Sequence, residues 1–203
     1  MKSNSISIAI SYKMSDSNLS NDFKFSLKLI DSNIVSNYDF IKTFIQVRQQ
    51  NQTNYFNRTV PTVANLSKYL AEGPISNPNH YMFTVSGIDN EIILCCGFKI
   101  HADKNFEIDN VIRLSTRYPG LMTVSLESLC KWMRSNFEIN SIFLRVISNN
   151  LSAINLYRKI GFVITDSVSL KSVRNAEGEE MLIKCDESEI STDTRMIFMQ
   201  QLS

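Results

Sequence analysis

The sequence predicts a mixed α/β protein built around one sheet. Apolar residues alternate with the period of a half-buried strand in several short segments and recur at helical spacing in others. The order is strand, two helices, a meander of three strands, helix, strand, helix and two further strands, which is typical of a mixed sheet covered by helices. A chain of 203 residues can form one sizeable core but hardly two. We therefore expect a single domain over residues 23–203, preceded at 1–22 by an arm or an extra edge strand.

The first strands are predicted from alternation. Ile6, Ile8 and Ile10 share one face of the segment 5–12, and residues 23–30 alternate again after a polar loop. Asp31 and Ser32 are suitable N-caps for the helix that follows. This helix is predicted to reach residue 50, because Ile34, Tyr38, Ile41 and Ile45 recur at helical spacing.

A second helix is predicted over residues 62–72. It opens after Pro61 with Thr62 as its cap and stops before Gly73-Pro74. Strands at 80–87 and 91–101 flank a turn at Asp89-Asn90 and form a hairpin. A further strand begins at residue 106.

The C-terminal third alternates between helices and strands. After a turn at 116–120, an amphipathic helix is predicted from its apolar face, which consists of Leu126, Leu129, Cys130, Met133 and Phe137. A buried strand at 141–147 leads into a short helix that Gly161 ends. Residues 162–170 and 194–202 are predicted strands, separated by charged loop material with a turn at 175–179.

Composition excludes several classes of protein. Hydrophobic residues make up 43% of the chain and charged residues 20%, as in ordinary globular proteins and unlike disordered ones. The net charge of +1, without a Lys/Arg cluster, argues against a nucleic-acid partner. No window has the apolar length of a membrane span, and the first residues lack the apolar core of a signal peptide. We expect a cytoplasmic protein with no membrane partner.

The cysteines do not indicate a metal site. Cys95, Cys96, Cys130 and Cys185 form no CxxC pair, and no His stands at zinc-ligand spacing. Cys95 and Cys96 are adjacent in a predicted strand and should therefore point to opposite faces as small buried residues. We interpret all four as reduced thiols.

The segment "NNLSAINLYRKIGF" at 149–162 follows the buried strand "SIFLRVI". It resembles the second signature of the GCN5-related N-acetyltransferase (GNAT) superfamily, a strand followed by N-x-x-A-x-x-L-Y-x-K-x-G-F. The matching residues are Asn150, Ala153, Leu156, Tyr157, Lys159, Gly161 and Phe162. The resemblance implies a three-layer α/β/α sandwich whose central sheet is mixed, mostly antiparallel and about seven-stranded, with splayed strands 4 and 5. It also implies transfer of an acetyl group from acetyl-coenzyme A (CoA) to a primary amine by direct attack in a ternary complex.

The resemblance further implies a cofactor site. Asn150 would bind the pantetheine arm beside Ala153, and Tyr157 would protonate the departing thiolate. A phenol with a pKa of about 10 can donate a hydrogen bond or proton to a thiolate whose conjugate acid has a pKa of about 8.5. Periodicity alone favours a core tyrosine at 157, and the matching neighbours favour the catalytic role. The splayed strand would supply backbone hydrogen bonds from Val111, Arg113, Leu114 and Ser115, with residues 107–115 pairing in parallel with 141–147.

The family's pyrophosphate loop has its counterpart in "RYPGLM". Arg117 and Gly120 match the family pattern, but Met122 stands where the family usually has Gly or Ala, and Pro119 removes one amide donor. A side chain at 122 is expected to crowd the phosphate. The residues expected to line this loop are Arg117, Tyr118, Gly120, Leu121, Met122 and Thr123. A plain strand-to-helix turn is the alternative interpretation.

Candidate bases and acceptor residues lie elsewhere in the chain. Glu107 and Asp109, which share one face of a strand, and His101 are the ionisable groups predicted near the site, although each is also compatible with a solvated edge position. Residues 47–70 are similar in rhythm to the helix-loop-helix of GNAT enzymes that act on nucleotide-linked amino sugars or ribosomal proteins. The residues that would face the acceptor are Arg48, Asn51, Asn54, Tyr55 and Phe56. Tyr55 and Phe56 are equally compatible with packing of the helix pair onto the sheet.

Three functions remain open at this point. The first is N-acetylation of a small-molecule amine, with an amino sugar as first choice. The second is N-acetylation of a protein or peptide, at its N-terminus or at lysine. The third, motivated by Met122, is a non-catalytic module that binds coenzyme A. The alternating segment 5–12 offers an edge for pairing with another subunit, so the protein is expected to be a monomer or a homodimer.

Overall fold

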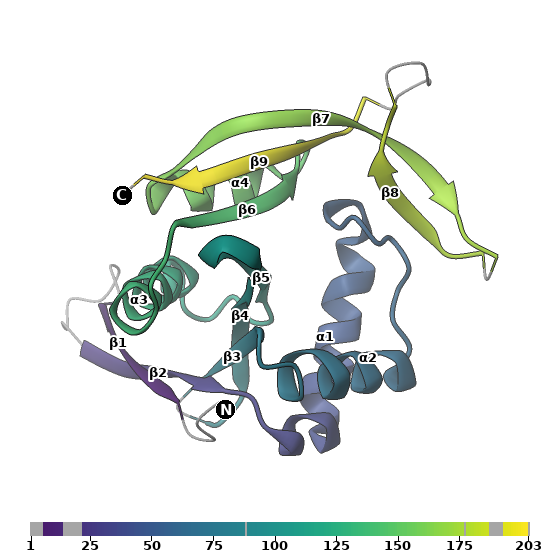
Figure 1. Ribbon diagram of the computed structural model, residues 1–203. Coiled ribbons are helices and arrows are strands. Elements are labelled where there is room, and N and C mark those ends of the chain that lie inside the picture. Colours follow the sequence, from purple (N-terminus) through teal and green to yellow (C-terminus); the bar gives the residue numbers. More distant parts are fainter. Residues whose placement is uncertain (1–5, 14–21, 88, 177, 187–192, 203) are drawn as a thin grey trace.

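The computed structural model describes residues 6–13, 22–87, 89–176, 178–186 and 193–202. Its sheet has the strand order β1-β2-β3-β4-β5-β6-β9-β7-β8, and all neighbours are antiparallel except β5 and β6 (Figure 1). The nine strands are β1 (Ser7–Lys13), β2 (Asp22–Leu29), β3 (His80–Ser86), β4 (Ile92–Ile100), β5 (Asn105–Arg113), β6 (Ser141–Ile147), β7 (Phe162–Arg174), β8 (Glu180–Lys184) and β9 (Arg195–Gln201). The predicted mixed, mostly antiparallel sheet is confirmed. It contains two strands more than the seven expected: β1, and β8, whose residues the sequence analysis assigned to a charged loop.

The segment predicted as an arm or an edge strand forms β1. It pairs with β2 along its whole length, from Ser7 opposite Lys28 to Lys13 opposite Asp22. Ile8, Ile10 and Tyr12 are buried in the main core. Residues 1–5 and 14–21 of the expected arm lie outside the described residues, and the division of the chain into arm and domain stays a prediction.

Two helices cover one face of the sheet. The predicted first helix is divided at Asn37 into η1 (Ser32–Ser36) and α1 (Tyr38–Gln50), because the Asn37 side chain caps α1 by accepting from the Phe40 amide at 2.9 Å. Thr62 caps α2 (Val63–Leu70) as expected, but the helical path does not stop before Gly73-Pro74. It continues through a π-helical turn, η3 (Ala71–Ile75). Short 3₁₀ turns follow α1 and β4, at η2 (Gln52–Asn54) and η4 (Ala102–Lys104).

The opposite face carries α3 (Leu121–Asn136) and α4 (Leu151–Lys159). Two cores result, one under α1 and α2 and a larger one under α3 and α4. Cys95 belongs to the first core and Cys96 to the second, which confirms that the two buried thiols point to opposite faces. The three layers expected from the family are therefore present (Figure 1).

The sheet divides between β5 and β6. These strands pair in parallel only from Asn105–Ser141 to Glu107–Phe143, so the prediction that residues 107–115 pair with 141–147 is wrong. Beyond Glu107, β5 bonds only to β4 and β6 only to β9. A bulge explains the divergence: Asn110 has a φ of 53°, and the register between β4 and β5 shifts between Cys95 and Gly97. The expected splay is present, but it opens earlier along the strand.

Two classes of feature are missing from the described part of the chain. None of its helices has the length and apolarity needed to cross a membrane. Nor does it contain a group of three or more His, Cys, Asp or Glu residues placed to hold a metal ion.

Candidate active site

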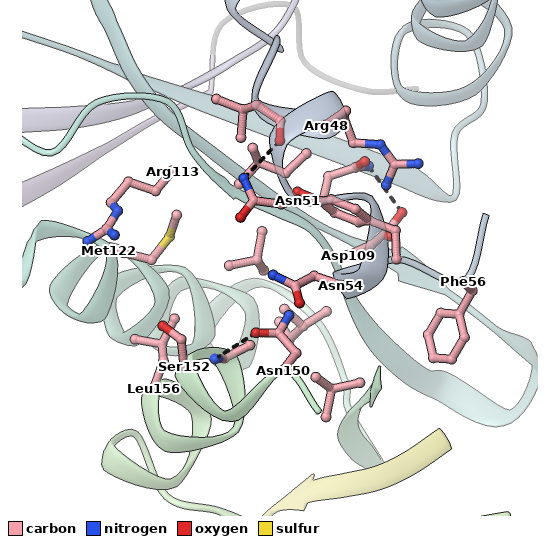
Figure 2. A pocket seen from close by; sticks show the side chains of 18 of the residues that line it. Arg48, Asn51, Asn54, Phe56, Asp109, Arg113, Met122, Asn150, Ser152 and Leu156 are labelled. Atoms are coloured by element: carbon pink, nitrogen blue, oxygen red, sulfur yellow. Dashed lines mark hydrogen bonds between the residues drawn. The ribbon is translucent and has the colours of Figure 1, made fainter. Parts of the chain in front are cut away.

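A cavity of about 1040 Å³ lies where β5 and β6 separate. Its walls come from α1 and the loop after it, from α2, from β5, from the start of α3, and from β6 and α4 (Figure 2). Residues far apart in the chain, such as Arg48, Asp109 and Asn150, therefore surround one space. All five predicted acceptor residues line it, as do Tyr157, Glu107 and Asp109.

Helix α4 and its N-cap bring five of the motif residues to the cavity: Asn150, Ala153, Leu156, Tyr157 and Lys159. Asn150 caps the helix, because its side-chain oxygen accepts from the Ala153 amide at 3.2 Å (Figure 2). Tyr157 is 8% exposed and borders the cavity. Burial raises the pKa of its hydroxyl, and the charge of Asp109 raises it further. Among the described residues none hydrogen-bonds to this hydroxyl, so a neutral O–H group is left for a bound molecule.

The start of α3 offers backbone donors. Gly120, at the N-cap, has a φ of 85°, a conformation that favours glycine. Within the described chain, the N–H groups of Gly120 and Met122 have no hydrogen-bond acceptor, and Pro119 has no N–H. A 16-residue helix with free amides at its N-terminus is suited to bind an anion such as a pyrophosphate. The residues present therefore fit coenzyme A at this position.

The Met122 side chain is held by packing, and its expected crowding of the phosphate stays a prediction. This side chain is 9% exposed and packs in the core beneath α3, at the border of the cavity (Figure 2). The side chain of Tyr118 is likewise held in an aromatic group with Tyr12, Phe23 and Phe25, at ring distances of 5.0 to 6.2 Å. Both residues line the cavity, together with Gly120 and Thr123.

Several predicted cofactor residues do not line the cavity. Arg117 pairs with Asp89 and, at 3.1 Å, with Glu91, both from the turn between β3 and β4. The amides of Leu114 and Ser115 both donate to the Ile93 carbonyl of β4, at 2.7 and 2.9 Å. These amides therefore do not face the splay. Leu121 is buried in the core, while Val111, Arg113 and Ala153 reach the cavity.

Glu107 is buried at the point where the strands separate. Its Oε1 accepts from Arg145 Nε at 2.7 Å, and its Oε2 lies 2.8 Å from His101 Nε2. Arg145 belongs to β6, so this ion pair bridges the two diverging strands. His101 does not line the cavity and reaches it only through Glu107. Both carboxylate oxygens of Glu107 are thus engaged within the protein.

Asp109 has a different environment. Its Oδ2 lies 2.8 Å from Lys99 Nζ, 3.2 Å from His80 Nε2 and 3.1 Å from Asn110 Nδ2. Burial disfavours the charged carboxylate, but the His80 hydrogen bond and the Lys99 charge outweigh it and lower the pKa of Asp109 to about 2. Asp109 therefore stays ionised near neutral pH.

The side of the cavity that is lined by the predicted acceptor residues is rich in amides and hydroxyls. The Arg48 guanidinium lies 3.7 Å above the Tyr55 ring, and its Nη2 donates to the Asn57 carbonyl at 2.8 Å. The sequence analysis missed Tyr69, whose hydroxyl bonds to Asn110 across the cavity at 2.9 and 3.1 Å. The sequence placed Tyr69 in a predicted helix beside Leu66 and Leu70, which are buried. It gave no indication of the strand that this helix faces, so the contact between Tyr69 and Asn110 could not be predicted. Further lining residues that were not predicted include Asn57, Thr59, Asn65, Lys99 and Arg145.

Comparisons with known proteins follow from this geometry. A family model described as an acetyltransferase (GNAT) domain matches residues 34–163. No curated protein sequence matches the chain.

Solved structures share the fold. One is a spermidine N-acetyltransferase from Vibrio cholerae in complex with CoA and spermine, with 13% identity, coverage of 87% of this chain and 95% of that chain, and a TM-score of 0.62. Another is RimL, a ribosomal L7/L12 alpha-N-protein acetyltransferase, in an apo crystal form, with 12% identity, coverage of 95% of each chain and a TM-score of 0.65. A third is an acetyltransferase of the GNAT family from Streptococcus pneumoniae, with 14% identity, coverage of 87% and 98%, and a TM-score of 0.58.

Proposed function

Because the chain belongs to the GNAT acetyltransferase family, whose members use acetyl-coenzyme A, we propose that it acetylates the primary amine of a small molecule, with an amino sugar as first choice. The family match covers α1 to the start of β7, which includes most of the residues around the cavity. The chain is thus an acetyl-coenzyme A-dependent N-acetyltransferase. The acceptor and the roles of individual residues are what the proposal adds.

We assign the cofactor to the side of the cavity formed by β5, α3 and α4. The free amides of Gly120 and Met122 would hold the pyrophosphate, and the open edge of β5 near Val111 would bond the pantetheine arm. Asn150 would orient that arm from the start of α4. When bound, acetyl-coenzyme A supplies an acetyl thioester, which an amine can attack. Tyr157 would donate its proton to the departing sulfur. Its free hydroxyl supports this role, and its raised pKa means that the group carries the proton at neutral pH.

The proposed path of the amine proton does not end on a protein carboxylate. Both oxygens of Glu107 are occupied, and a carboxyl group with a pKa of about 2, as at Asp109, is a weak base at neutral pH. We propose that Asp109 attracts the acceptor's ammonium group, which then loses its proton to water in the cavity. The neighbouring Lys99 charge would favour this loss, because a like charge lowers the pKa of an amine.

The choice of an amino sugar as the proposed acceptor rests on the residues that line the acceptor side of the cavity. Its neutral groups, on Asn51, Asn54, Tyr55, Asn57 and Tyr69, suit the hydroxyls of a sugar ring. A polyamine carries several ammonium groups and would require several carboxylates without cationic partners. Of the carboxylates that line the cavity, Glu107 is paired with Arg145 and Asp109 with Lys99, whereas Glu179 has no ion-pair partner within the described chain. With a single carboxylate left unpaired, the lining favours an acceptor with one amine and several hydroxyls over a polyamine.

A panel of amines tests the proposal. Thiol release from acetyl-coenzyme A is measured with glucosamine, a nucleotide-linked amino sugar, spermidine and a short peptide with a free N-terminus. We expect the highest kcat/KM for an amino sugar. A higher value for spermidine would contradict the electrostatic argument, and a higher value for the peptide would favour a protein acceptor.

A further inference from the structure

The loop that carries the acceptor residues is attached to a strand from the far end of the chain. We call residues 51–61 the acceptor loop. The Arg58 amide donates to the Glu180 carbonyl at 2.9 Å, and the Leu182 amide donates to the Phe56 carbonyl at 2.7 Å. Asn57 and Met181 form an isolated antiparallel bridge between these bonds. The acceptor loop thus pairs with β8 as a short additional strand.

Side chains reinforce this attachment. Arg58 Nη1 lies 2.8 Å from Glu180 Oε1, and the two side chains are 25% and 32% exposed. Ser172 on β7 donates to the same carboxylate oxygen at 2.9 Å. On the inner side, Phe56 packs against a small apolar cluster that consists of Ile147, Leu170, Leu182 and Met196. The contact is therefore both polar and apolar.

The two partners belong to different halves of the divided sheet. The acceptor loop follows α1, which packs over β3 and β4, whereas β8 continues the half formed by β6, β9 and β7 (Figure 1). Between Glu107 and the far end of the cavity, β5 and β6 share no hydrogen bonds. The contact between the acceptor loop and β8 thus joins the two walls across the splay.

This contact also determines where acceptor residues lie. Asn57, whose carbonyl accepts from Arg48, is flanked by the two residues that bond to β8. Arg48 in turn covers the Tyr55 ring. Release of the loop from β8 would therefore displace Tyr55 and Asn57 while leaving α4 and the start of α3 in place. The consequence is confined to the acceptor side of the cavity.

We propose that Arg58 and Glu180 are positioning residues for the acceptor: their ion pair holds the acceptor loop on β8 and so fixes the wall that contacts the amine substrate. This rests on the proposed function, since it assumes that the loop faces the acceptor. Neither residue lines the cavity, and neither touches the reacting atoms. They act through the loop.

Two measurements on Glu180→Gln and Arg58→Gln test this. The first is amide hydrogen exchange in the free protein, where we expect faster exchange at Arg58 and Leu182 and unchanged exchange in α4. The second is steady-state kinetics with the best amine of the panel. We expect the acceptor KM to rise about two- to fivefold, the factor that an ion pair near the surface contributes, with the KM for acetyl-coenzyme A unchanged.

Controls separate positioning from general loss of structure. Lys104→Gln removes a different ion pair, Lys104–Glu138 at 2.6 Å, and should change neither readout. Arg58→Lys keeps the charge and should lie between wild type and Arg58→Gln. Unchanged exchange at Arg58 and Leu182 in both Gln variants would overturn the proposal, and so would equal rises in the two KM values. If no amine in the panel is acetylated, the proposed acceptor class fails, while the exchange measurement still decides whether this ion pair holds the loop.

Discussion

The Tyr157 hydroxyl borders the cavity as a neutral group, because burial raises its pKa. Tyr157→Phe removes this proton donor and little else, since the ring keeps its packing beside Phe162. We expect kcat to fall about a hundredfold, the lower range for a general acid, with the dissociation constant of acetyl-coenzyme A unchanged. Turnover and calorimetric titration measure the two quantities. An unchanged kcat would remove Tyr157 from the chemistry; Tyr38→Phe, at an exposed position, is the control.

Asp109 should make stability depend on acid pH. Its carboxyl pKa falls from the ordinary value of 3.8 to about 2 in the folded protein, so the ionised group stabilises the fold above pH 3.8. This contribution is lost as the pH falls through about 2. Between about pH 6 and pH 3, the free energy of unfolding of Asp109→Asn should therefore fall by about 1 kcal/mol less than that of wild type. Urea unfolding at both pH values measures this, with Asp39→Asn on the surface of α1 as control. Equal losses would contradict the low pKa.

Sequence reasoning located some site residues and missed the partners of others. Asn150 and Tyr157 were recognisable because both belong to one local segment. They are seven residues apart, about two helical turns, so they lie on the same side of the helix. The pairing of Arg117 with Asp89 and Glu91 could not be recognised from the sequence. The two carboxylates belong to a turn about 30 positions before Arg117, and only the folded sheet brings the three side chains together. Charges alone do not reveal which cation neutralises which carboxylate.

At the scale of single elements, the N-cap of α4 has two separable roles. Asn150 holds the helix through its side-chain oxygen, and its amide group is the part proposed to contact the cofactor. Asn150→Asp keeps a capping oxygen, so stability should stay near wild type while acetyl-coenzyme A binds more weakly. Asn150→Ala loses both and should also reduce the free energy of unfolding by about 1 kcal/mol. Chemical denaturation and ligand titration distinguish them. Wild-type affinity in Asn150→Asp would contradict the cofactor contact.

Strand β1 contacts the loop before α3 that is proposed to hold the pyrophosphate. The Tyr12 hydroxyl donates to the Pro119 carbonyl at 2.7 Å, one residue before the N-cap of α3. We expect Tyr12→Phe to raise the dissociation constant of acetyl-coenzyme A about two- to tenfold, as the loss of one hydrogen bond allows the loop to move. Calorimetric titration measures the constant, and Tyr38→Phe is again the control. Identical affinities would show that β1 is not needed to hold the loop.

Whether a strand could be predicted depended on how local its signal was. Alternation in residues 5–12 and 23–30 indicated β1 and β2 directly. Strand β8 was missed because two of its five residues are charged, Glu180 and Lys184, and its stability comes from β7 and the acceptor loop. The parallel register of β5 and β6 was wrong for a related reason. The register depends on the bulge at Asn110, which the amino-acid pattern does not predict.

At the scale of the whole molecule, the division of the sheet places the proposed cofactor and acceptor sites next to each other. Strands β1 to β5 support α1 and α2, and β6, β9, β7 and β8 support α4 (Figure 1). In the proposed function both substrates meet at the division. At one end the halves are joined by the short parallel pairing of β5 with β6 and by the Glu107–Arg145 pair, and at the other end by the acceptor loop on β8. Whether the protein is a monomer or a homodimer stays a prediction.

A ligand that joins both halves should stabilise the entire fold. Acetyl-coenzyme A at a hundredfold excess over its dissociation constant contributes about 2.7 kcal/mol if it binds only the folded state. For a chain of this size that corresponds to a rise in melting temperature of about 5 to 10 °C, measured by calorimetry. Tyr157→Phe should show the same rise, because it affects chemistry and not binding. Tyr12→Phe, with its weaker site, should show a smaller one at the same ligand concentration. No rise in wild type at millimolar ligand would contradict the assignment of the α3 N-terminus and the splay to the cofactor.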